Sequence, residues 1–137
     1  MLGFTLAATV AASVGAQAPH TYKGLDVSVK GVETLTNVGL ADCPPGANTQ
    51  RGVIKPGDAT EFALVTVDFK VTSAFKPGPL PKPVLIDDAG KTYNTAQSFA
   101  DVGATPAFTC TFAFRVPKGT KAKRFQIDTL NVEVAPK

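Results

Sequence analysis

In two segments of the sequence every second residue is apolar over five successive positions, and no other feature constrains the fold as strongly. The apolar positions of the first segment are Ala63, Val65, Val67, Phe69 and Val71. Those of the second segment are Phe108, Cys110, Phe112, Phe114 and Val116. Because side chains alternate between the two faces of a β-strand, each set occupies one face. Two apolar faces of this length predict two sheets that pack through their inner surfaces.

Shorter segments with the same alternation predict further strands, separated by turn residues. Residues 25–29 alternate, and the pattern changes phase at Gly31, as it does at a β-bulge. Asp87-Asp88-Ala89-Gly90 lies between the short segments 84–86 and 91–93 and predicts a hairpin turn. A second change of phase occurs within residues 125–134. No helical periodicity is long enough to predict a helix, so we expect an all-β domain of about seven strands.

The first residues have the composition of a secretory signal peptide. Leu2–Ala16 is apolar or small and uncharged, and it is shorter than the about 20 residues of a membrane-spanning helix. Cleavage after this run leaves Gln17 as the new terminus, whereas a cut two residues later would place Pro19 beside the bond. We therefore expect a signal peptide at 1–16 and the domain at 17–137. A buried Ala-rich helix is the alternative.

One feature departs from a typical signal peptide, because no Lys or Arg precedes the apolar run. Two explanations are open: the start lies further upstream, or the amino terminus alone supplies the positive charge.

Cys43 and Cys110 are the only cysteines of the chain. An even number of cysteines in an exported protein predicts a disulfide. This bridge would close a long loop and contribute about 4 kcal/mol to stability. The alternative is a pair of free thiols, because Cys110 lies within an apolar alternation and suits ordinary core packing.

Side chains that perform catalysis or hold metals are few. His20 is the only histidine, and we expect it in a mobile N-terminal arm, unsuited to Ser-His-Asp chemistry or to zinc and copper sites. Asp87 and Asp88 are candidates for paired carboxylates or calcium ligands, but the Ala-Gly that follows them favours a turn. Nucleotide-binding and serine-hydrolase motifs do not occur. The sequence predicts no catalytic residue, no cofactor and no metal site, and we expect no enzyme.

The charge of the chain gives little indication of a nucleic-acid partner. The formal net charge is +3, and the 14 Lys and Arg residues are scattered. One small basic cluster consists of Lys118, Lys121, Lys123 and Arg124. Its position after a proline and around a glycine favours a charged turn, with an anionic docking patch as the alternative.

Residues 76–83 contain four prolines in eight positions and predict a stiff, extended segment. A rigid connector between sheets is one interpretation. A docking segment for an aromatic groove is the other.

Four strand-and-turn patterns resemble the telokin-like, immunoglobulin-like extracellular domain of unknown function found in bacterial lipoproteins and secreted proteins. They are Asp26–Glu33, Lys55–Gly57, Leu85–Tyr93 and Phe112–Gly119. The resemblance covers about residues 25–134 and implies an immunoglobulin-like β-sandwich without catalytic residues. Many members of that group are lipidated on a cysteine at the mature N-terminus, and this chain has none there.

The expected function is a non-enzymatic interaction or structural module of the bacterial cell envelope, in the periplasm or outside the cell. Its partner would be a protein or another envelope component, with no nucleic acid and no membrane span after processing. The alternative is a periplasmic carrier that binds a small ligand in an apolar pocket of the sandwich. An enzyme would require a mechanism that uses carboxylates alone.

Overall fold

The computed structural model describes residues 20–45, 53–54, 57 and 59–135. In this part of the chain every regular element is a strand. The strands are β1 (His20–Tyr22), β2 (Leu25–Leu35), β3 (Val38–Gly39), β4 (Val53–Ile54), β5 (Thr60–Val71), β6 (Val84–Asp87), β7 (Thr92–Asn94), β8 (Ala107–Pro117), β9 (Ala122–Ile127) and β10 (Leu130–Glu133). The expected signal peptide at 1–16, its cleavage site before Gln17 and the Lys55-Pro56 pair lie outside the described residues.

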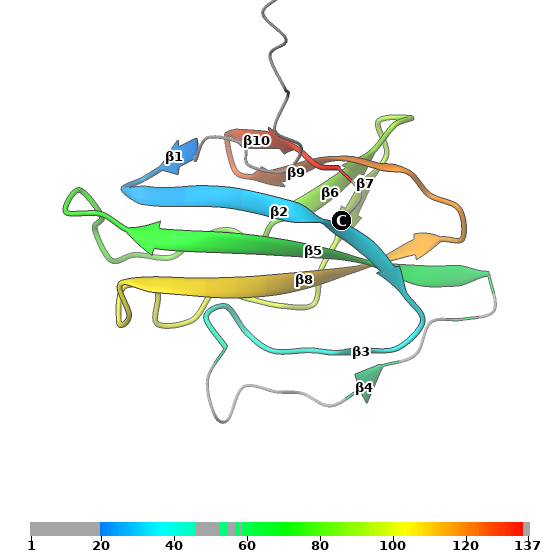
Figure 1. The fold of residues 1–137 in the computed structure, drawn as a ribbon, viewed down its shortest axis with the longest axis horizontal. Coiled ribbons are helices and arrows are strands. Elements are labelled where there is room, and N and C mark those ends of the chain that lie inside the picture. The colour runs from blue at the N-terminus through cyan, green and yellow to red at the C-terminus, as the bar shows by residue number, and fades with distance from the viewer. Residues whose placement is uncertain (1–19, 46–52, 55–56, 58, 136–137) are drawn as a thin grey trace, which may run out of the picture.

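The strands form two four-stranded antiparallel sheets that pack face to face (Figure 1). The first sheet has the order β1-β2-β5-β8, and the second has the order β10-β9-β6-β7. Strands β3 and β4 pair separately. The all-β prediction is therefore confirmed, although eight strands rather than about seven make up the two main sheets.

Both predicted apolar faces lie in one core, as expected. Val65, Val67, Phe112 and Phe114 are fully buried, and Phe125 reaches them from the opposite sheet. The ring of Phe125 lies 5.6 Å from that of Phe112 and 6.4 Å from that of Phe114. These aromatic rings fill the centre of the sandwich, so the two sheets are held together by apolar contact.

The predicted bulge in β2 is confirmed. The register of β2 on β5 shifts between Val29 and Gly31, and Gly31 has a positive φ of 149°. The extra residue returns Val32 to the inner face, opposite Val65.

The expectation of a mobile arm at His20 was wrong. His20 begins β1 and lies opposite Val27 of β2. A two-residue turn joins the strands, with φ of 48° at Lys23 and 82° at Gly24, which suits a hairpin of type I′. A Cβ at Gly24 would lie 2.3 Å from the backbone nitrogen of Phe75, so this turn requires glycine.

Near the end of the chain, the change of phase noted in the sequence corresponds to a second hairpin. Asp128 has a φ of 54°, and the chain reverses there. Strands β9 and β10 therefore pair with each other, with Ile127 opposite Leu130. The turn also ties the sheets together, because the hydroxyl of Tyr22 donates a hydrogen bond of 2.9 Å to the Asp128 carboxylate.

The turn at Asp87 is the predicted hairpin between β6 and β7. Its carboxylate accepts hydrogen bonds from the N–H of Lys91 (2.8 Å), the N–H of Ala89 (3.0 Å) and the hydroxyl of Tyr93 (2.9 Å). The bond from Lys91 is the largest influence and lowers the pKa of Asp87, with a smaller opposing effect of burial. Asp87 therefore holds the turn together as an anion.

This lowered pKa predicts how stability changes in acid. The hydrogen bonds of Asp87 contribute fully above the group's ordinary pKa of 3.8, and the contribution is lost as pH falls through the lower pKa of the folded state. We expect the unfolding free energy of Asp87→Asn to decrease less than that of the unaltered protein as pH falls through this range. Urea titration at successive pH values measures the difference. The exposed neighbour Asp88 provides the control, and equal pH profiles for Asp87→Asn and Asp88→Asn would contradict this role.

Residues 76–83 run from β5 of the first sheet to β6 of the second, in agreement with the connector interpretation. Most of the segment is exposed, but Leu80 packs against the core and Pro83 is buried.

Residues 36–45, here called the strap, cover part of the outer face of the first sheet. Val38 and Leu40 of the strap are buried in a small second cluster with Phe62 of β5 and Ala113 of β8. The strap then continues past β8, the edge strand of this sheet (Figure 1).

Candidate functional site

The predicted disulfide between Cys43 and Cys110 is present. It joins the strap to β8 across a Cα–Cα distance of 5.5 Å, and both cysteines are buried. The backbone of Cys43 is fixed as well: its N–H donates to Ser98 (2.9 Å), and its C=O accepts from Ala100 (2.8 Å). The end of the strap is thus attached both to β8 and to residues 98–100, which precede β8.

Gln97 fixes the same region through its side chain and is almost completely buried. Its amide nitrogen donates to the C=O of Thr111 (2.5 Å) and to the C=O of Ala41 in the strap (2.8 Å). Its amide oxygen accepts from the N–H of Ala113 (2.6 Å). One side chain therefore pairs with the edge of β8 as a neighbouring strand would, and it holds the strap against that edge.

We expect Gln97→Ala to lower the unfolding free energy by about 2–3 kcal/mol, because it leaves three backbone groups without their partner. Gln126→Ala is the matched control, since Gln126 donates a single exposed hydrogen bond to Asp128, and its loss should cost less than about 1 kcal/mol. Chemical denaturation of both variants measures the difference. Equal costs would show that Gln97 does not secure the edge.

Next to this covered stretch, no strand among the described residues pairs with the outer edge of β8. A groove of about 430 Å³ runs beside Ala107, Phe108 and Thr109. Its other walls are Pro44, Pro45, Ala100, Asp101, Ala104 and Thr105. The strap and the 100–105 loop thus frame the first half of β8, while Gln97 covers the second half.

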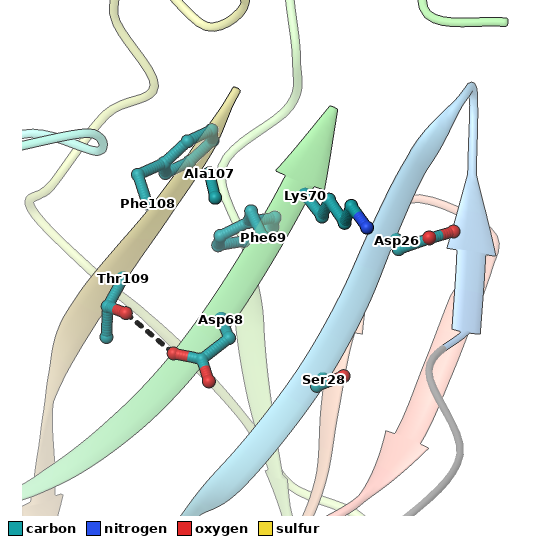
Figure 2. A pocket seen from close by; sticks show the side chains of 8 residues that line it. All are labelled: Asp26, Ser28, Asp68, Phe69, Lys70, Ala107, Phe108 and Thr109. Carbon is teal, nitrogen blue, oxygen red and sulfur yellow. Dashed lines mark hydrogen bonds between the residues drawn. The ribbon is translucent and has the colours of Figure 1, made fainter. Parts of the chain in front are cut away.

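A second hollow lies on the outer face of the same sheet (Figure 2). It has a volume of about 520 Å³ and is lined by Asp26, Ser28, Asp68, Phe69, Lys70, Ala107, Phe108 and Thr109. Asp68 accepts a hydrogen bond of 2.6 Å from the hydroxyl of Thr109 and forms an ion pair of 3.3 Å with Lys30. Because both hollows share Ala107–Thr109, this stretch of β8 is the centre of the candidate site.

Other residues singled out in the sequence lie elsewhere. The basic residues Lys118, Lys121, Lys123 and Arg124 are exposed in the β8–β9 turn and in β9, at the other end of β8. Within the residues that the structure covers, no group of three or more His, Cys, Asp or Glu side chains is placed to hold a metal ion. No helix in this part of the chain is long and apolar enough to cross a membrane.

Sequence reasoning found the disulfide of this site but neither Gln97 nor the groove. Gln97 lies in a stretch without periodicity, and its partners are distant in sequence. Comparison with protein-family models, with curated proteins and with solved structures found no match to this chain.

Proposed function

We propose that this protein is a non-enzymatic binding module of the bacterial cell envelope, with an immunoglobulin-like sandwich that holds the binding surface rigid. One observation carries the proposal: the two hollows meet at an open strand edge, and a disulfide fixes the wall of one of them. Asp68, which lines the second hollow, is engaged with Lys30 and Thr109. The site therefore offers shape, backbone groups and apolar contact, which suit recognition.

The disulfide supports an oxidising compartment, as in exported proteins. If residues 1–16 are a signal peptide, the exported protein should begin at Gln17, and intact-mass measurement checks this directly. An exported species that retains residues 1–16 would contradict the proposed processing.

Retention of an envelope component on the immobilised domain tests the binding function. Ala104→Trp places a large ring in the groove, whereas Thr92→Trp places the same ring on exposed β7 of the other sheet. We expect the unaltered domain and Thr92→Trp to retain the same component from an envelope extract, and Ala104→Trp to lose it. Identical retention by all three proteins, or none by any, would contradict a binding function at this site.

A carrier of small apolar ligands is the second candidate, supported by a groove of about 590 Å³ between the end of β2 and the start of β9. Val32, Ala63 and Ala122 provide its apolar lining, and Glu33 and Lys121 lie among the residues around it. This function predicts that an apolar fluorescent probe binds and that Ala122→Trp displaces it. Binding that is unaffected by Ala122→Trp would exclude this groove.

A further inference from the structure

The backbone of β8 shows which of its groups point out of the sheet. In an antiparallel ladder, every second residue directs both its N–H and its C=O away from the paired strand. The C=O of Thr111 and the N–H of Ala113 point outward, because both bind Gln97. By the same alternation, the backbone groups of Ala107 and Thr109 point outward, into the groove. Among the described residues, none pairs with the outward N–H or C=O of Thr109.

We propose that this open edge binds an extended peptide segment of a partner protein by strand addition, along Ala107–Thr111. The inference rests on the proposed binding function and names the partner class. In this mode the main chain of the peptide supplies the hydrogen bonds, and alternate side chains enter pockets beside the edge. Gln97 shows that the edge accepts this pairing, because its amide occupies the next positions of β8 with a donor and an acceptor.

The groove walls define the chemistry of the peptide. Pro44 and Pro45 carry no N–H, so they cannot donate to the outward C=O groups of β8, which stay available to the incoming chain. Phe108 is half-buried and offers an apolar surface for one small or branched side chain. Asp101 is exposed and is the single charged residue among the described residues of the wall. A short β-forming segment with one basic residue fits this arrangement.

The short length of the open edge argues against a second copy of this chain. Two β8 strands paired about Thr109 would place residue 105 of one copy beside residue 113 of the other. That position is already covered by Gln97, and the strap lies next to it. A short peptide can end before it reaches residue 113. In a folded second copy, however, the 100–105 loop is continuous with β8 and would meet this obstruction.

Titration of the oxidised, 15N-labelled protein with a blocked Thr-Val-Lys-Val-Thr peptide tests this inference by NMR. We expect the amide signals of Thr109 and Thr111 to shift and their hydrogen exchange to slow. Methylating the amide nitrogen of the central residue in the peptide should weaken binding about tenfold, because one main-chain hydrogen bond is lost. In the protein, Thr109→Pro should abolish binding, whereas Thr109→Val retains the N–H and should preserve it.

Three other outcomes would contradict strand addition. Shifts confined to other strands, equal affinity of the methylated peptide, or a peptide-independent dimer that protects Thr109 would do so. Absence of peptide binding while Ala104→Trp still abolishes retention of an envelope component would reject strand addition but leave the binding function standing. Failure of both experiments would reject both.

Discussion

Replacing Cys43 and Cys110 together with alanine is expected to lower the unfolding free energy by about 4 kcal/mol. The bridge spans 67 residues, and the constraint that such a loop places on the unfolded chain accounts for a loss of this size. For a domain of this length the loss corresponds to a fall of about 15 °C in Tm. Thermal melts followed by circular dichroism, with and without reductant, measure it.

The double variant also serves as the control for the reductant. Its Tm should not respond to reductant, whereas the Tm of the unaltered protein should fall toward that of the variant. If both thiols of the folded, untreated protein react with a thiol reagent and reductant leaves its Tm unchanged, the disulfide is absent in solution.

Phe112→Ala is expected to cost about 3–5 kcal/mol, because it removes a buried ring from the centre of the core. The ring is fully buried and contacts Phe125 at 5.6 Å and Phe99 at 5.7 Å between ring centroids. Urea denaturation gives the change in free energy. The expected result is a large drop in the midpoint with little change in slope.

Phe108→Ala is the matched control, because Phe108 lies on the same face of the same strand but is only partly buried. Its ring stacks on Phe69 at 5.1 Å, so its removal should cost about 1–2 kcal/mol. Similar costs for the two variants would mean that the centre of the core lies elsewhere than between these sheets.

The long strands could be predicted because burial of one face of a strand produces an apolar residue at every second position of the sequence. Every second residue of β5 and β8 faces the core, so the period of two identified both strands. β1 has three residues and carries no period, and its existence depends on the left-handed conformations of Lys23 and Gly24. The reversal at Asp128 depends on the same backbone conformation, which only the folded chain reveals.

The site was predictable only where two cysteines indicated a covalent bond. The side-chain amide of Gln97 takes the place of the backbone of a neighbouring strand. Nothing in the local sequence distinguishes Gln97 from an exposed glutamine in a loop. Its partners Ala41 and Ala113 contribute main-chain atoms, so their side chains carry no signal. The groove likewise depends on how the strap passes β8, a matter of tertiary structure.

Photo-crosslinking in cells that export the protein tests the central claim most directly: the β8 edge is where this protein meets its partner. A photoreactive residue replaces Ala104 in the groove wall or, as the control, Thr92 on β7, and both positions are exposed. We predict a discrete adduct from position 104, none from position 92, and loss of the adduct when Thr109→Pro is added. Equal adducts from both positions, or an adduct from position 104 that persists with Thr109→Pro, would contradict the claim.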